Sequence, residues 1–250
     1  MPIIKINNKN IYYNIQGKGE TLILLHDGFY NTTSWDSVRN ELSKHFTVID
    51  YDRFGYGKSD KLTKKIKEDL IDLYVEELEI IVKKLNLKKF YLCGHCLGGA
   101  IALIYTMRNP EKVYKIIAES VGYFSDKKIL VKSNFTFKPF DMINEHLKKN
   151  LIKMNGEDYA RKFWEIISDY DLTYIMSENY NILNEVKKIK CPVFIISGDR
   201  DIYFEVEHSI TAFKTIKNST LWIVPDTNHI PHIEKKDDFI KNVIKFIKMK

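Results

Sequence analysis

Cysteine, carboxylate and histidine side chains stand in this sequence in an order that nucleophilic catalysis could use. Cys96 lies in Gly94-His95-Cys96-Leu97-Gly98, carboxylates follow in Gly198-Asp199-Arg200-Asp201, and an imidazole follows in Asp226-Thr227-Asn228-His229. Such catalysis needs a nucleophile, a base that takes its proton and an acid that orients the base. The three stretches therefore indicate attack of a thiolate on an electrophilic centre, with base and acid supplied from later in the chain.

The motif around Cys96 joins a strand pattern to a helix pattern. Residues 89–93 are apolar and aromatic, and an apolar helical pattern follows at Ile101, Leu103, Ile104 and Met107. A sharp strand-to-helix turn of the form G-x-nucleophile-x-G lifts the central side chain out of the sheet. Small residues flank it because a Cβ would clash with backbone, and the positive helix end favours a thiolate.

The same letters allow a redox interpretation. Cys93-Gly94-His95-Cys96 is a C-x-x-C motif, which after a strand is also typical of a thioredoxin-like site. Against this, two glycines follow the second cysteine, and the chain upstream holds more strand and helix patterns than a small thioredoxin domain has. In the non-redox interpretation Cys93 and Cys191 are small core residues.

Strand and helix patterns alternate along most of the chain, and several strands are continuous apolar runs, as in strands buried on both faces. We expect an N-terminal hairpin at 3–6 and 11–15, further strands at 21–25, 46–50, 89–93, 113–120, 192–196 and 221–224, and helices around 35–42, 70–85, 101–107, 210–213 and 237–248. This alternation predicts an α/β fold with a mostly parallel sheet covered by helices on both faces. Functional groups in such sheets lie beyond the C-terminal ends of the strands.

The alternation fails between residues 122 and 188, where the sequence is helix-prone. We therefore expect a core in two parts, 1–121 and 189–250, interrupted by a helical insertion at 122–188. Aromatic residues of this insertion either line an apolar substrate pocket or form a small core of their own; they are Phe135, Phe137, Phe140, Tyr159, Phe163, Trp164, Tyr170, Tyr174 and Tyr180.

Four landmarks in order resemble the α/β-hydrolase fold superfamily over nearly the whole chain apart from the insertion. They are His26-Asp27-Gly28 after the third strand, the D-x-x-G-x-G-x-S loop at 52–59, the Cys96 turn as nucleophile elbow, and the late acid and histidine. The resemblance implies the α/β-hydrolase fold, with the insertion as a helical lid.

The resemblance also implies roles for individual residues. Cys96 matches the nucleophile, His229 the general base, and Asp201 the acid, with Asp199 as the alternative acid. The backbone amides of Gly28 and Leu97 match the oxyanion hole, where fixed donors stabilise a tetrahedral intermediate. We also expect Phe29 and His95 to lie at the substrate site.

A second set of expectations concerns the remaining residues of these landmarks. His26 and His95 are expected to make structural hydrogen bonds beside the site, and Asp52 and Arg53 to tie their loop to neighbouring strands. The histidines without a landmark are expected on the surface; they are His45, His146, His208 and His232.

Three positions depart from the common pattern of that superfamily. Cysteine stands at Cys96 where serine is usual, either as a natural nucleophile, as in the dienelactone hydrolases, or as an engineered replacement of serine. Asp27 follows His26 where glycine is usual, and a carboxylate there would oppose a developing oxyanion unless it were paired. Asn228 stands where glycine often precedes the histidine, and asparagine tolerates positive φ.

Composition narrows the class of protein further. A hydrophobic fraction of 44% supports a full core, and the formal charge of +6 comes from scattered lysines without the basic and aromatic clustering of a nucleic-acid site. Three cysteines, an odd number, argue against a disulfide framework. With no signal-peptide pattern and no apolar run of transmembrane length, we expect a cytoplasmic protein that binds neither nucleic acid nor membrane, as a monomer or a homodimer.

The sequence therefore predicts an enzyme that hydrolyses a small or medium carboxylic ester, thioester or lactone. No cofactor and no metal are expected, because no histidine and carboxylate cluster has the spacing of metal ligands. Two alternatives on the same fold are an acyltransferase and a slow-turnover ligand sensor, and a third is a thiol-disulfide protein that uses Cys93 and Cys96.

Overall fold

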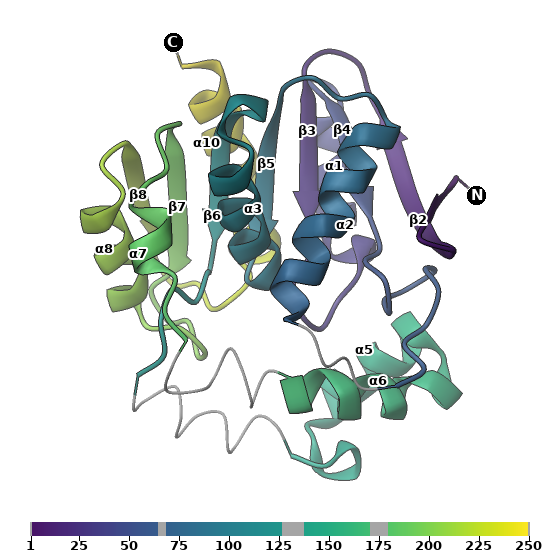
Figure 1. Ribbon diagram of the computed structural model, residues 1–250. Coiled ribbons are helices and arrows are strands. Elements are labelled where there is room, and N and C mark those ends of the chain that lie inside the picture. The colour runs from purple at the N-terminus through teal and green to yellow at the C-terminus, as the bar shows by residue number, and fades with distance from the viewer. Residues whose placement is uncertain (1, 65–68, 127–137, 171–179, 250) are drawn as a thin grey trace.

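A computed structural model, which describes residues 2–64, 69–126, 138–170 and 180–249, shows a single eight-stranded sheet (Figure 1). The strands are β1 (Ile3–Ile6), β2 (Lys9–Gln16), β3 (Thr21–Leu25), β4 (Thr47–Tyr51), β5 (Phe90–His95), β6 (Val113–Glu119), β7 (Val193–Gly198) and β8 (Ser219–Val224). Their order is β1-β2-β4-β3-β5-β6-β7-β8. The pairs β1–β2 and β2–β4 are antiparallel and the other five are parallel, which confirms the predicted mostly parallel sheet and its N-terminal hairpin.

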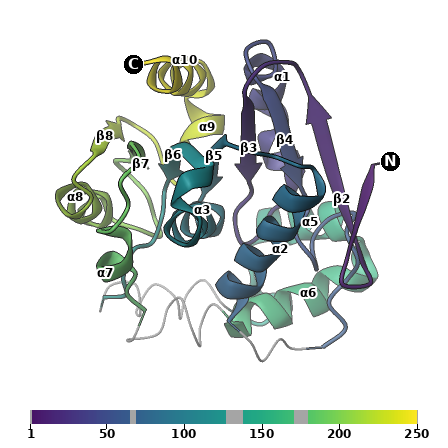
Figure 2. The same cartoon turned by 45° about the horizontal axis from the view of Figure 1, so that its top comes forward.

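Helices cover both faces of this sheet (Figure 2). The helices that the structure describes are α1 (Asp36–Leu42), α2 (Leu70–Lys84), α3 (Leu97–Arg108), α5 (Glu145–Asn155), α6 (Glu157–Tyr170), α7 (Leu183–Val186), α8 (Val206–Thr215), α9 (Pro231–Glu234) and α10 (Lys236–Lys248), with short 3-10 turns at Thr32–Trp35, Pro110–Lys112 and Phe140–Met142. Alternating residues of β3 show the two layers. Leu22 and Leu24 pack with α1 and α10, whereas Ile23 and Leu25 pack with α2 and α3.

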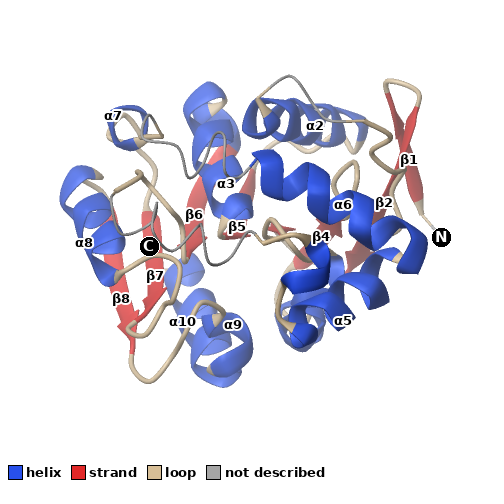
Figure 3. Ribbon diagram, turned by 90° about the horizontal axis from the view of Figure 1, so that it is seen from below, coloured by secondary structure: helices blue, strands red, loops and turns tan. Residues whose placement is uncertain are grey.

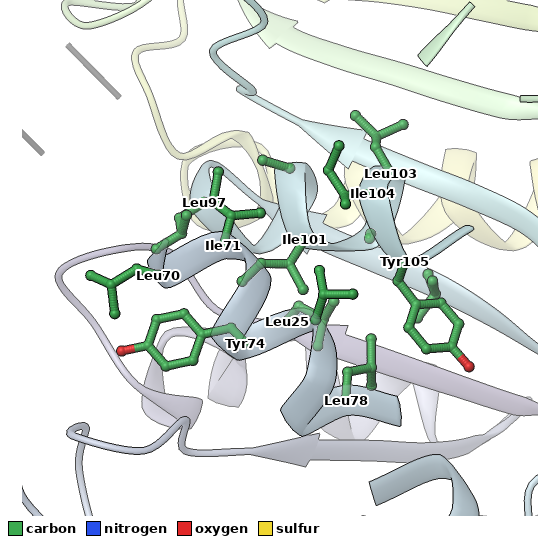
Figure 4. Close-up of a cluster of buried hydrophobic side chains, with 14 of the residues drawn as sticks. Leu25, Leu70, Ile71, Tyr74, Leu78, Leu97, Ile101, Leu103, Ile104 and Tyr105 are labelled. Atoms are coloured by element: carbon green, nitrogen blue, oxygen red, sulfur yellow. The ribbon is translucent and has the colours of Figure 1, made fainter. Parts of the chain in front are cut away.

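The helix that follows Cys96 lies at the centre of one layer. Ten of its twelve residues are buried, which is why α3 is apolar nearly all round rather than on one stripe. In Figure 4 the α3 side chains Ile101 and Leu97 face Ile71 and Tyr74 of α2, above Leu25 of β3. A largely buried helix packed on the central strand β5 gives the elbow at its N-terminus a rigid support.

The helices α5 and α6 lie beside each other below the sheet, on the side where the parallel strands end (Figures 1 and 3). Tyr159 of α6 anchors them to the loop after β4, because its hydroxyl donates to the Gly55 carbonyl at 3.0 Å and accepts from the Leu62 amide at 2.9 Å. The division of the chain at 121 and 188 remains a prediction, since residues 127–137 and 171–179 between these boundaries lie outside the described residues.

The insertion's aromatic residues divide between the two expected uses. Phe140, Phe163 and Trp164 are at most 5% exposed and belong to a hydrophobic cluster. Tyr180 is also buried in that cluster but lines the site cavity described below. Phe135, Phe137 and Tyr174 lie outside the described residues, and so does the side chain of Tyr170. Packing therefore accounts for three of these aromatics, and Tyr180 also faces the site.

Candidate active site

Cys96 occupies a strained turn between β5 and α3. Its backbone has φ 50° and ψ −115°, a region that a residue with a side chain rarely adopts. The turn is possible because a Cβ at Gly94 would overlap the Gly98 carbonyl, and a Cβ at Gly98 would overlap the Leu25 carbonyl. The Cys96 amide donates to the Glu119 carbonyl at 2.8 Å, which fixes the elbow to β6.

A second pair of residues meets across the loops that follow β7 and β8. His229 Nδ1 lies 2.8 Å from Asp201 Oδ2. The other oxygen, Oδ1, accepts the Tyr203 and Phe204 amides at 2.8 and 3.1 Å. A carboxylate only accepts, so Nδ1 carries the proton, and in the neutral ring the lone pair is on Nε2.

The pKa values of this pair shift apart. Burial opposes charge on both groups, but Asp201 outweighs it at His229 and raises the pKa of the imidazole. At Asp201 burial is outweighed by His229 and the two amides, so the pKa of the carboxyl is lowered. Asp199, the alternative acid, is exposed and accepts the Thr227 amide at 3.1 Å instead.

Both Cys96 and His229 line one cavity of about 540 Å³. Its other lining residues come from the loop after β3, from α3, from the insertion and from the loops after β7 and β8; they are Asp27, Gly28, Phe29, Tyr30, Leu97, Ala100, Gly122, Asn144, His146, Leu147, Tyr180, Ile202, Tyr203, Phe204, Asn228, Ile230 and Glu234. Among the predicted site residues, Gly28, Phe29 and Leu97 thus share a cavity with Cys96 and His229.

Several of these lining residues are not among the predicted site residues. Tyr203 contacts His229 edge-to-face with ring centroids 4.7 Å apart, and Phe204 lies 5.8 Å from the same ring. Their place two and three positions after Asp201 was an available signal, because residues so close to the acid in the chain lie near the base that it contacts. The insertion residues Asn144, His146 and Leu147 offered no such signal, since they have no landmark.

The loop after β3 positions the predicted oxyanion donors. Asp27 Oδ1 accepts the Phe29 and Tyr30 amides, each at 2.7 Å, so those two donors are already used. Within the described residues, neither the Gly28 amide nor the Leu97 amide donates to a protein acceptor, and Leu97 is the first residue of α3, where amides lack an intrahelical partner. The Gly28 carbonyl accepts the Tyr56 hydroxyl at 3.0 Å, which holds the loop in place.

His26 makes the structural hydrogen bonds that the sequence predicts. Its Nδ1 lies 2.9 Å from the Asp27 carbonyl and its Nε2 accepts the Arg53 amide at 3.2 Å, so the ring is neutral. Burial and the Arg53 charge keep the pKa of His26 well below its usual range. The Arg53 guanidinium in turn donates to the His26 and Asp27 carbonyls, and Asp52 accepts the Thr32 and Lys58 amides. The predicted tie between this loop and its neighbours is confirmed.

His95 lies beneath the site rather than in it. It is fully buried and is absent from the cavity lining, so its side chain has no direct access to a substrate. Its Nε2 donates to the His229 carbonyl at 2.9 Å, and its Nδ1 lies 3.3 Å from Asp27 Oδ2. Asp27, which stands where glycine is usual, therefore has its carboxylate beside His95. A carboxylate next to an oxyanion donor requires such a partner.

Two of the histidines expected on the surface are buried, and that expectation was wrong for them. His232 is fully buried, with Nδ1 2.7 Å from Glu119 Oε2 and Nε2 3.2 Å from the Ser34 carbonyl. His208 is 1% exposed and stacks on Phe124 with centroids 4.1 Å apart. The partners of His232, and the Phe124 ring beside His208, lie far away in the sequence, so no local pattern marks these histidines as buried.

Two further positions near the site, Asn228 and Cys93, have structural roles. Asn228 does not need positive φ, because Asp226 at φ 51° makes that turn. Cys93 is fully buried in the α1 and α10 layer, and burial raises the pKa of its thiol well above the usual range.

Over the described residues no group of three His, Cys, Asp or Glu side chains could hold a metal ion. No helix in the described ranges is long and apolar enough to cross a membrane.

Comparisons with known proteins agree with this architecture. The family described as "alpha/beta hydrolase fold" matches residues 21–143. A solved structure of MGS-M2, an alpha/beta hydrolase enzyme from a Medee basin deep-sea metagenome library, superposes with a TM-score of 0.84 at 19% identity, covering 100% of this chain and 98% of the other. The chain has the α/β-hydrolase fold.

One protein similar in sequence and one further solved structure also match this chain. The human protein "Serine hydrolase BPHL" is 25% identical over 243 residues, 95% of this chain and 83% of that protein. The enol-lactonase from Burkholderia xenovorans LB400 superposes with a TM-score of 0.77 at 18% identity, covering 99% of this chain and all of the other. The fold class predicted from four landmarks is thus confirmed.

Proposed function

We propose that this protein is a hydrolase of small or medium carboxylic esters, thioesters or lactones, with Cys96 as nucleophile, His229 as base and Asp201 as acid. The observation that carries the proposal is the 2.8 Å contact between His229 and Asp201 beside a cavity that Cys96 also lines. The relatives support the reaction class, since one is named a serine hydrolase and another an enol-lactonase. The cysteine is this chain's own feature, and the proposal assigns it the position that serine holds in the common motif.

The proposed acylation step uses His229, Cys96 and the two backbone amides in turn. Nε2 of His229 takes the thiol proton, and Sγ of Cys96 attacks the carbonyl carbon of the substrate. The carbonyl oxygen becomes an oxyanion, which accepts hydrogen bonds from the Gly28 and Leu97 amides at the positive end of α3. As the tetrahedral intermediate collapses, His229 returns the proton to the departing alkoxide or thiolate, or to the ring-opened oxygen of a lactone.

The acyl group then remains on sulfur as a thioester. His229 removes a proton from water, the hydroxide attacks the thioester carbonyl, and the thiolate leaves and regains its proton from His229. Asp201 stabilises the imidazolium in both steps without itself taking the proton.

The cavity favours compact, largely apolar acyl groups. At about 540 Å³ it falls in the usual size range of small-molecule sites, and Leu97, Leu147 and Phe204 supply apolar surface. Phe29 packs against Trp164 of α6 with ring centroids 5.5 Å apart, so the insertion supports one wall. We assign residues 122–188 to a lid on these contacts.

Intact-protein mass spectrometry beside a turnover assay tests the proposal. Activated short-chain esters and thioesters are given to the wild type, Cys96→Ala, Cys96→Ser and Cys93→Ala. We expect an acyl adduct in the wild type that persists in Cys93→Ala and is lost in Cys96→Ala together with turnover. Cys96→Ser tests whether the same elbow supports an oxygen nucleophile.

Equal turnover in the wild type and Cys96→Ala would refute the mechanism. Loss of the adduct in Cys93→Ala would instead support a redox or dithiol role, which the burial of Cys93 disfavours. A stable adduct without turnover would identify a slow sensor, and release of the acyl group only to an added alcohol or amine would identify a transferase.

A further inference from the structure

We propose that Asp27 and His95 form a buried ion pair, Asp27 carboxylate with His95 imidazolium, that positions His229 and neutralises the carboxylate beside the oxyanion hole. The proposal rests on the proposed function for its catalytic consequences, but the charge state of His95 can be measured without any activity. Neither residue touches the reacting atoms in this proposal, and both act through His229 and the loop after β3.

The contacts of His95 determine its protonation state. Nε2 faces the His229 carbonyl at 2.9 Å, and a carbonyl only accepts, so Nε2 carries a proton. Nδ1 lies 3.3 Å from Asp27 Oδ2, which is within ion-pair distance but lacks the alignment of a hydrogen bond. A lone pair on Nδ1 would repel that carboxylate, whereas a second proton there makes an ion pair.

The contacts of Asp27 show why it stays ionised in a buried place. The residue is 4% exposed, yet Oδ1 accepts the Phe29 and Tyr30 amides at 2.7 Å each while Oδ2 faces His95. Burial raises the pKa of a carboxyl, but these donors and His95 outweigh it and lower the pKa of Asp27 below its usual range. At His95, burial lowers the pKa, and Asp27 and Glu119 more than offset it.

Other titratable groups near His95 come from several elements and act on its charge in opposite directions. One of them is His26 in the loop after β3, which is neutral. Glu119 lies at the end of β6, His229 lies in the loop after β8, and His232 of α9 has its ring centroid 5.2 Å from that of His95. Glu119 favours a charged His95 and His229 opposes it. Because Glu119 is also paired with His232, Asp27 is the counter-ion specific to His95.

The ion pair connects the three parts of the site. Asp27 holds the loop that carries Gly28, His95 precedes Cys96 in the elbow, and its Nε2 holds the His229 backbone. A neutral residue at 95 would leave Asp27 uncompensated beside the oxyanion donors. An unpaired negative charge there would oppose the oxyanion and also raise the pKa of His229.

Nitrogen-15 NMR of histidine-labelled protein tests the charge state directly. The His95 ring, assigned by the signals lost in His95→Gln, is expected to show protons on both nitrogens at pH 8. In Asp27→Asn it is expected to lose the Nδ1 proton at that pH. A singly protonated His95 ring in the wild type at pH 8 would overturn the proposal, whether or not the protein hydrolyses esters.

A double-mutant cycle tests the catalytic consequence with 4-nitrophenyl butyrate as probe. His95→Gln is expected to lower kcat by roughly 10- to 100-fold and to move the acid limb of kcat/KM to higher pH, since it leaves Asp27 unpaired. The double variant Asp27→Asn with His95→Gln removes both charges and keeps amide partners, so it should recover most of that loss. A double variant no better than His95→Gln would refute charge compensation and leave only a packing role for His95.

Discussion

At the scale of single residues, Asp201 and Asp199 are two positions apart yet have different partners. Asp201 contacts the imidazole of His229 and Asp199 the amide of Thr227. Asp201→Asn is expected to lower kcat/KM by roughly 10³- to 10⁴-fold, because an amide neither stabilises the imidazolium nor selects the tautomer. The acid limb of the pH profile should move to lower pH, since Asp201 is the main group that raises the pKa of His229.

Measurement of kcat/KM from pH 5 to 9 checks this prediction, and Asp199→Asn is the matched control. Because the Asp199 side chain is exposed and contacts a backbone amide instead of the imidazole, the control should change kcat/KM less than about threefold. If the two variants exchanged these effects, Asp199 would be the acid.

The sequence predicts the role or burial of a polar residue only where a local motif, such as a turn with glycines or the end of a strand, marks its position. Cys96 is flanked by glycines, and His229 and Asp201 follow strand patterns, so each has such a pattern. His232 has none, because its partner Glu119 is 113 positions away and belongs to a different strand end. Long-range pairing of polar groups is decided by the assembled sheet, which is why His232 was wrongly expected on the surface.

At the scale of elements, Glu77 of α2 reaches the loop after β4, where Oε2 accepts the Phe54 amide at 3.0 Å. Burial raises the pKa of this carboxyl to about 8 from its ordinary value of 4.5. A group whose pKa is raised on folding contributes full stability below its unfolded pKa and loses it as the pH rises towards its folded pKa. Between about pH 5 and 8, Glu77 therefore makes the protein less stable as the pH rises.

Glu77→Gln keeps an acceptor for the Phe54 amide and cannot ionise. Its unfolding free energy is expected to match the wild type near pH 5 and to exceed it at pH 9 by on the order of 4 kcal/mol. Urea unfolding at the two pH values measures this, with the exposed neighbour in Glu76→Gln as control. An unchanged difference between pH 5 and pH 9 would show that Glu77 is ionised without penalty in the folded chain.

Strands and helices were predictable where the spacing of apolar residues determines them. Thr21–Leu25 and Val193–Gly198 are apolar on both faces because both faces of a central parallel strand are covered, and each was expected within two residues of its observed bounds. The bounds of the two helices in the insertion could not be predicted in the same way. Glu145–Asn155 and Glu157–Tyr170 are separated by a single residue, Gly156, at φ 81°, and the sequence pattern did not place that turn.

At the scale of the whole molecule, the fold class was predictable from the sequence, but the order of strands in the sheet was not. Local patterns give strands and helices without saying which strands pair. The observed order places β3 between β4 and β5, so the loop carrying Gly28 lies beside the Cys96 elbow. The site is thus a property of the sheet order, since its residues come from positions 28 to 229.

Glu119 and His232 join three distant segments of that assembled molecule, because His232 also contacts the Ser34 carbonyl. Both side chains are fully buried, and His232 outweighs burial to lower the pKa of Glu119 below 4.5. A carboxyl with a lowered folded pKa contributes stability above its unfolded pKa and loses it as the pH falls through the folded pKa. The pair should therefore contribute stability at neutral pH that acid removes.

Glu119→Gln is expected to lower the unfolding free energy at pH 7 by about 3 kcal/mol or more, since it leaves a buried imidazole without its counter-ion. The gap to the wild type should narrow below about pH 4.5, because the unfolded chain then takes up a proton at this carboxyl that the folded wild type binds only at lower pH. Urea midpoints at pH 7, 5 and 4 measure this, and Glu119→Gln combined with His232→Asn should cost less than the sum of the single changes. A gap independent of pH, or strictly additive losses, would mean that the two residues contribute packing volume and not a charge pair.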